Sequence, residues 1–320
     1  MRREKKFRAG PIPVRSARNH FLFAFSIAKS LKKCQNSLFG ILMFCILAMQ
    51  PILNAFAFYY HNKGVSVNYG AARGIGSLCY SGCSMLLGML TVQLGSFAVP
   101  CSLGFLGALV FLLVFFMPDL QGDNVSAGRE EKKDTLRLSE FPAFTLMLAG
   151  LSLVMLFHNM VMTYFIHVIG RAGGDSSHMG VAIGIAGLVE IPVLFLYTRV
   201  KGNRPSKIFL AVSGAAFFAK AVLFLFARRI FMIYAIQCLQ CLAFGLMAAS
   251  RVYNVDEVVG KKYEATGQAF MSATETIGIV LGSVIGGFLM QASGIDMLLW
   301  VAALMCLAGM VMMAVSALRS

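Results

Sequence analysis

The chain has 320 residues, of which 58% are hydrophobic and 13% are charged. Soluble domains carry about 25% charged residues, so this chain cannot cover a water-facing surface. The composition therefore excludes a soluble enzyme and a soluble nucleic-acid-binding module. The formal net charge is +14, but its basic residues lie in connections between long apolar runs, as expected for a membrane protein.

Nine apolar segments are each long enough to cross a bilayer as a helix. A hydrocarbon core of roughly 30 Å needs about 20 helical residues at 1.5 Å each. The segments do not alternate with period two, and lipid offers no partner for open backbone groups, so helices are favoured over strands. The sequence predicts an all-α polytopic membrane protein with about nine transmembrane helices. The predicted spans are 38–58, 74–96, 97–117, 143–166, 179–198, 208–227, 230–250, 266–290 and 297–317.

Basic residues gather in alternate connections between these spans. The largest connection, about 118–142, lies on the same side of the predicted serpentine path as the loops that hold Lys201 and Arg251, and as Arg319. Because cytoplasmic loops are enriched in Lys and Arg, this pattern predicts a cytoplasmic C-terminus in the cell membrane.

The N-terminal segment departs from this pattern. Residues 1–37 hold ten basic residues and one acidic residue, yet nine spans with a cytoplasmic C-terminus would place them outside the cell. Residues 69–88 and 263–282 form a weak internal repeat, and the 118–142 connection follows three spans but precedes six. Parallel six-helix repeats are a transporter architecture, so we expect that three helices are missing before residue 38. The predicted organisation is a basic segment without a span (1–37), a partial N-terminal half (38–117), a central cytoplasmic loop (118–142) and a complete C-terminal half (143–320).

Several short stretches resemble the major facilitator superfamily. They are YGAARGIGS at 69–77, GLVEIPVLFLYTRV at 187–200, the mid-helix Lys220, ATGQAF at 265–270 and GSVIGGFLMQASG at 282–294. From about residue 38 to the end, the chain is most similar to the branch with phenylpropionate permease-like and lactose permease-like proton symporters. The resemblance implies that the nine spans are helices 4–12 of a twelve-helix bundle. It also implies transport of a small solute, often coupled to protons.

One departure from that branch limits what the resemblance implies. Lactose-type symporters carry a histidine and a carboxylate on the tenth helix, where this chain has Gln237 and Gln240. Galactoside transport through that proton relay is therefore not expected here.

Three residues of the Asp, Glu, Lys and Arg types lie inside the predicted spans. A charge at a helix centre costs about 2.5–3.5 kcal/mol on insertion scales, so Glu190, Lys220 and Glu275 are expected to face a cavity or a partner. Pro192 can kink the helix beside Glu190, which we expect to bind protons. We expect Lys220 to hold an anionic substrate group or to balance a carboxylate. The alternative for all three is a structural ion pair or a hydrogen-bonded buried carboxyl.

Neutral polar residues within the spans are further candidates for the solute pathway. A histidine can exchange protons near neutral pH. Two polar side chains three or four residues apart share a helix face. The alternative reading is hydrogen bonding between helices. The predicted substrate and proton pathway comprises Glu190, Lys220, Glu275, His158, Asn159, Gln50, Asn54, Gln237 and Gln240.

Glycines on one helix face predict close helix packing. Gly278, Gly282 and Gly286 recur every four residues, which lets a neighbouring backbone approach. Together with Pro192 and Arg73, these residues are predicted to act in helix packing or gating.

The sequence contains no phosphate-binding glycine loop and no zinc-ligand pattern. We therefore expect no cofactor, no metal, no nucleotide, no nucleic acid and no enzymatic activity. The expected partners are a small solute, protons and the lipid bilayer. The leading hypothesis is secondary active transport of a small organic solute, such as a sugar, a nucleoside or an aromatic acid, by proton-coupled symport. The alternative is a truncated non-transporting, structural or sensor membrane protein.

Overall fold

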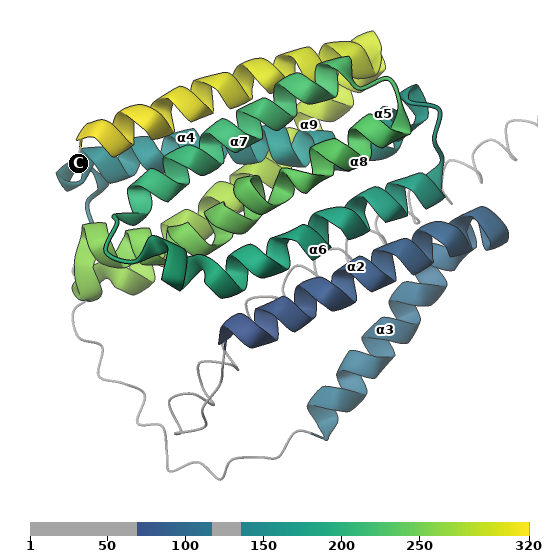
Figure 1. Ribbon diagram of the computed structural model, residues 1–320, viewed down its shortest axis with the longest axis horizontal. Coiled ribbons are helices and arrows are strands. Elements are labelled where there is room, and N and C mark those ends of the chain that lie inside the picture. The colour runs from purple at the N-terminus through teal and green to yellow at the C-terminus, as the bar shows by residue number, and fades with distance from the viewer. Residues whose placement is uncertain (1–68, 117–135, 320) are drawn as a thin grey trace, which may run out of the picture. The chain divides into compact units, whose positions relative to one another are not determined.

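The computed structural model describes residues 69–116 and 136–319, and every regular element in these two ranges is helical (Figure 1). The long helices are α2 (Tyr69–Leu94), α3 (Ala98–Phe115), α4 (Pro142–Thr163), α6 (Ser176–Lys201), α7 (Ser206–Phe226) and α9 (Leu246–Arg319). The shorter elements are η1 (Gly95–Phe97), η2 (Leu138–Glu140), α5 (Phe165–Arg171), α8 (Ile230–Cys238) and the π-helical turn η3 (Cys241–Gly245).

Seven helical segments in the described ranges are long and apolar enough to cross a membrane. The last of these, Thr266–Arg319, has 54 residues, far more than the roughly 20 that one crossing needs. It is broken at Gly294, so it supplies two crossings. The predicted all-α membrane fold is confirmed. Eight of the nine predicted spans have a counterpart, and the first, 38–58, lies outside the described residues.

Two glycines divide α9 into three helical stretches. Gly260 has φ 70° and Gly294 has φ 76°, a left-handed backbone region that glycine enters without a Cβ clash. The chain can therefore reverse between consecutive crossings without a long loop.

The core of the bundle lies between α4 and α9. They approach closely at Gly150 and Gly309, where a Cβ on Gly309 would lie 2.6 Å from the carbonyl oxygen of Gly150. The buried side chains of Val154 and Met313 pack against this contact. Small residues thus set the distance between the two helices, as is usual in membrane bundles.

The glycines at 278, 282 and 286 also face α4. A Cβ on Gly278, Gly282 or Gly286 would lie 2.7–3.0 Å from atoms of α4 or of the following Tyr164. A larger residue at any of these positions would therefore push the last part of the chain away from α4.

A second glycine contact joins α2 and α6. A Cβ on Gly88 or on Gly180 would lie 2.9 Å from the Cα of the other glycine, and Gly184 lies against Met85. These contacts bring the polar residues of α2 close to those of α6.

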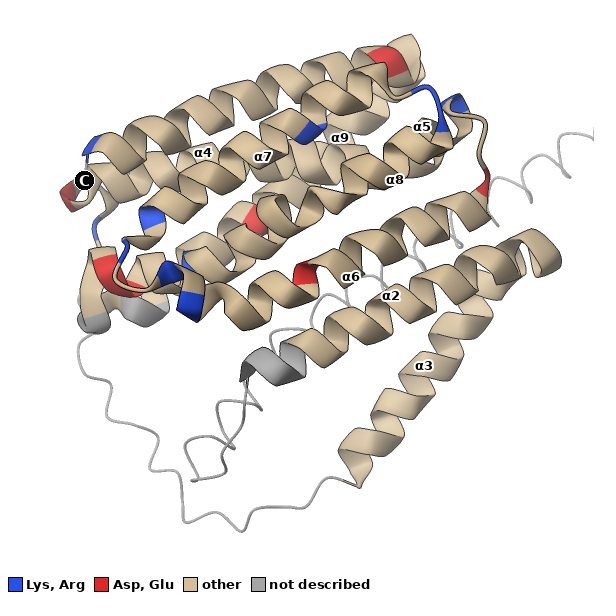
Figure 2. Ribbon diagram, in the orientation of Figure 1, with Lys and Arg blue, Asp and Glu red and all other residues tan. Residues whose placement is uncertain are grey.

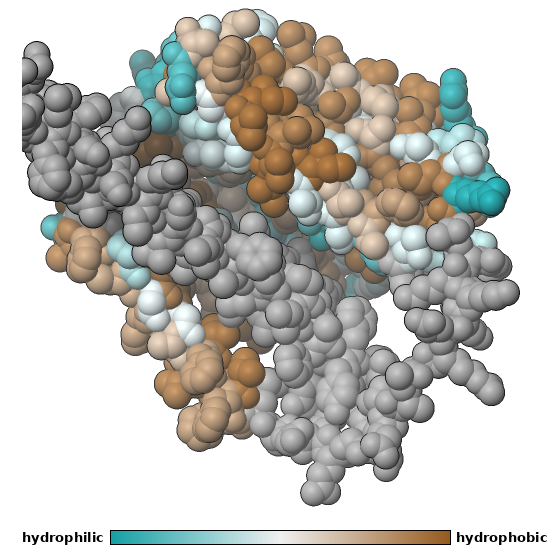
Figure 3. Space-filling model, turned by 180° about the vertical axis from the view of Figure 1, so that it is seen from behind, coloured by the Kyte–Doolittle hydropathy of each residue, from teal (hydrophilic) through white to brown (hydrophobic). Residues whose placement is uncertain are grey.

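The surface is that of a membrane protein. Apolar residues occupy the middle of the visible described surface and hydrophilic residues gather toward its ends (Figure 3). Most Lys, Arg, Asp and Glu residues of the described ranges likewise lie near helix ends (Figure 2). The few charges away from the ends therefore need partners within the bundle.

Candidate functional site

Lys220 is a buried cation within the bundle. It lies on α7, and its side chain is 1% exposed. Phe217 and Phe224, one turn on either side, are also fully buried, and the Lys220 ammonium lies 5.9 Å from the Phe224 ring centroid. An ammonium in such surroundings must be held by polar groups, because an unsolvated charge costs several kcal/mol.

Two glutamines supply those polar groups. Lys220 Nζ donates to Gln237 Oε1 at 3.1 Å and also donates to Gln240 Oε1. Both glutamines are buried. Gln237 Nε2 has no hydrogen-bond partner among the described residues. The cluster therefore pairs a cation with neutral acceptors and leaves one amide donor available for a ligand.

An interruption of the helix positions the second glutamine. Leu239 breaks the regular helix, and the π-helical turn Cys241–Gly245 begins directly after Gln240. Ser213 Oγ on α7 donates to the carbonyl oxygen of Ala243 in this turn at 2.7 Å. Single π-helical turns are frequent at functional sites, because they change which face a side chain occupies.

A carboxylate from α6 reaches the same cluster. Glu190 packs against the π-helical turn, since a Cβ on Gly245 would lie 3.4 Å from Glu190 Cγ. Its carboxylate interacts electrostatically with Lys220 and with Tyr80 on α2. Pro192 lies inside α6, two residues further on. Three helices thus contribute ionisable side chains to one region.

Tyr80 was not predicted from the sequence. It lies in an apolar run 110 positions before Glu190, and a Cβ on Gly187 would lie 3.3 Å from its ring. The sequence did show a tyrosine, with its phenolic hydroxyl, inside a predicted span. Nothing in the sequence indicated that this side chain lies beside α6.

His158 on α4 joins the cluster through aromatic contacts. Its ring stacks on Phe244 and meets Phe217 edge-on, both at 5.5 Å between centroids. It also interacts electrostatically with Lys220. The neighbouring Asn159 instead donates to the carbonyl oxygen of Met155 in its own helix at 2.9 Å.

Glu275 lies in a separate contact. Its Oε1 is 2.5 Å from Arg251 Nη1, with the side chains 26% and 14% exposed. The prediction that Arg251 lies in a loop was wrong, because the helix continues to Gly260 and Arg251 lies within it. An apolar run that ends at residue 250 does not end the helix, because a partner carboxylate can accommodate the arginine inside the bundle.

Three further predicted residues, Gln50, Asn54 and Arg73, have no described side chain. Gln50 and Asn54 lie outside the described residues. Arg73 lies in α2, and its side chain is not described. In the described ranges, no group of three or more His, Cys, Asp or Glu side chains could hold a metal ion.

A sequence model of the MFS_1 like family matches residues 32–302. The chain belongs to this family. The family is a membrane-transporter family of the major facilitator superfamily, which agrees with the helical bundle and its polar centre. Comparison with curated proteins gave no match.

Proposed function

We propose that this MFS_1 like protein is a secondary active transporter that moves a small organic solute together with protons. The observation that carries the proposal is the buried Lys220, held by neutral amides with the Glu190 carboxylate within electrostatic range. A charge kept at such cost inside a membrane bundle marks a substrate or ion pathway.

The arrangement offers a direct way to couple a proton to a solute. While Glu190 is ionised, its charge balances that of Lys220. A proton on Glu190 removes that balance, so Lys220 gains from an acceptor group on the solute. Proton and solute therefore favour each other's binding, and this reciprocity is the thermodynamic requirement for symport.

Other residues of the cluster give the proposed site its shape. The free amide donor of Gln237 can bind a solute acceptor, and Tyr80 and His158 offer ring faces and hydrogen-bonding atoms. Such a combination suits a sugar, a nucleoside or an aromatic acid.

We further propose a location in the cell membrane with the end of α9 in the cytoplasm. Lys201, Arg204 and Lys207 lie at the α6–α7 connection, and Lys207 lines the same small pocket as Ser316 near the end of α9. Basic residues at one end of the bundle support this orientation.

The test is solute accumulation in vesicles that contain the full chain, with an imposed proton gradient and a panel of sugars, nucleosides and aromatic acids. Glu190→Gln fixes the neutral form of the side chain, so we expect it to lose gradient-driven accumulation but to keep solute exchange at equal pH. Glu140→Gln, which neutralises an exposed carboxylate beside α4, is the matched control and should accumulate normally. Accumulation that is unchanged in Glu190→Gln would contradict the role of Glu190. An absence of any uptake would favour the non-transporting alternative.

A further inference from the structure

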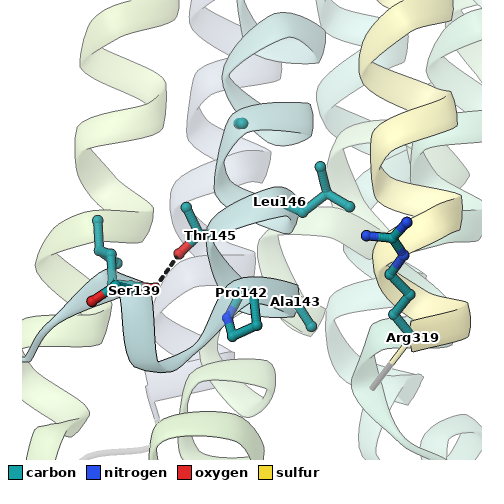
Figure 4. A pocket seen from close by; sticks show the side chains of 8 residues that line it. Ser139, Pro142, Ala143, Thr145, Leu146 and Arg319 are labelled. Carbon is teal, nitrogen blue, oxygen red and sulfur yellow. Dashed lines mark hydrogen bonds between the residues drawn. The ribbon is translucent and has the colours of Figure 1, made fainter.

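An open pocket lies at the end of the bundle, away from the Lys220 cluster. Its volume is about 640 Å³, within the range of about 300–1,000 Å³ typical of ligand pockets. It lies between η2, the start of α4 and the last turn of α9 (Figure 4). Its lining consists of Leu138, Ser139, Pro142, Ala143, Thr145, Leu146, Ala149 and Arg319.

Hydrogen bonds hold the walls of this pocket in place. Thr145 Oγ1 donates to the carbonyl oxygen of Leu138 at 2.7 Å, which ties η2 to α4. Ser316 Oγ donates to the carbonyl oxygen of Ala143 at 2.6 Å, which ties the end of α9 to α4. The pocket is therefore a fixed feature of the fold.

The lining combines an apolar surface with one cation. Leu138, Leu146 and Ala149 contribute apolar surface to the lining. Arg319 extends from α9 on the side of the pocket where Leu146 lies (Figure 4). No carboxylate of the described ranges forms an ion pair with Arg319. The adjacent start of α4 has no side-chain cap, so its positive helix end also faces this region.

We propose that this pocket binds one anionic phospholipid. Its phosphate would lie on Arg319 at the edge of the bundle, and part of an acyl chain would lie along the apolar walls of α4. A phosphate and an arginine are complementary in charge and geometry. Anionic lipids are also concentrated in the cytoplasmic leaflet, where we place this end of the bundle. The proposal does not depend on transport activity.

The experiment uses the full chain in phosphatidylcholine vesicles with a photoreactive phosphatidylglycerol. We expect labelling of the peptides around residues 138–149 and 310–319, and competition by phosphatidylglycerol but not by phosphatidylcholine with the same acyl chains. Arg319→Gln should reduce the labelling about fivefold, the effect of one cation near an anionic membrane surface. Arg319→Lys should retain most of it, and Ala149→Phe should reduce it by filling the pocket.

Arg229→Gln is the matched control, because it removes an exposed arginine elsewhere and should leave the labelling unchanged. Equal competition by both lipids, or undiminished labelling of the folded Arg319→Gln protein, would overturn the proposal. So would efficient cross-linking of Leu146→Cys to a cysteine placed in segment 117–135 without lipid labelling, because that result assigns the pocket to this segment.

Discussion

Charges at the helix ends and the charge in the middle of the bundle have different partners. Near one end, Arg171 pairs with Asp296 at 2.6 Å, and elsewhere Lys201 pairs with Glu257 at 2.8 Å. In the middle, Lys220 donates to two neutral glutamine oxygens instead. Water and backbone carbonyls can solvate the charges at the helix ends, whereas only protein groups solvate the central cation.

We propose that the charges at the helix ends stabilise the fold, whereas the central charge of Lys220 acts in transport. Arg171 also donates to the carbonyl oxygens of Phe224 and Ala227, which close the end of α7. Such an arginine joins three chain segments and satisfies free helix-end acceptors. Lys220 joins α7 to the interrupted helix after it, but its charge still lacks the full hydration it would have in water. We propose that Lys220 serves transport rather than stability.

The largest effect is expected for Lys220→Met. Solute uptake should fall about 100-fold, because the proposed site loses its cation; this is roughly 2.8 kcal/mol at 1.4 kcal/mol per tenfold. The free energy of unfolding should change by only about 1 kcal/mol, since relief of the buried charge offsets the two glutamine oxygens left without a donor. Uptake in vesicles and denaturant unfolding in detergent measure the two effects. Normal uptake by this variant would contradict the proposed role of the central cation in transport.

Arg171→Met should show the opposite pattern. We expect the free energy of unfolding to fall by about 2–3 kcal/mol, because the acceptors at the end of α7 and Asp296 lose a charged donor. Uptake per folded molecule should stay close to normal. Arg229→Met, at an exposed position near the same end, should change stability by less than about 0.5 kcal/mol. If both variants were equally stable, the end contacts would contribute no more than an ordinary surface charge.

The smallest effect is expected at the start of α6. Asp175 caps this helix by accepting from the backbone N–H groups of Ser177 and His178, and its Oδ1 lies 2.7 Å from His178 Nδ1. The hydrogen bonds from His178, its side chain foremost, lower the pKa of Asp175 below the ordinary value of 3.8. The capping contribution is therefore present above pH 3.8 and is lost as the pH falls through the lowered pKa.

Thermal unfolding of wild type and Asp175→Asn between about pH 5 and pH 3 tests this contribution. The wild type should lose slightly more stability than the variant over this range. A steeper loss in the variant would mean that another group causes the acid sensitivity.

Part of the central cluster consists of residues that were named from the sequence. Lys220, Gln237 and Gln240 are all predicted pathway residues, but their mutual contact was not predicted. They meet because a short connection joins α7 to α8, and Gln240 lies just after α8. Tyr80 was not predicted, because Glu190, with which it interacts, lies more than a hundred residues away along the chain. The local composition of a segment does not indicate which helix, far away in the sequence, it will contact.

The membrane class, the helical state and the positions of eight spans in the described ranges could be predicted from the amino-acid sequence alone. Those properties follow from local apolar length, because a helix must satisfy its own backbone in lipid. The partners of the polar side chains could not be predicted in this way: Glu275 pairs with Arg251, whereas Asn159 donates a hydrogen bond within its own helix. The rotation and register of each helix decide these partners, and both are set by the packing of glycines against neighbouring backbones.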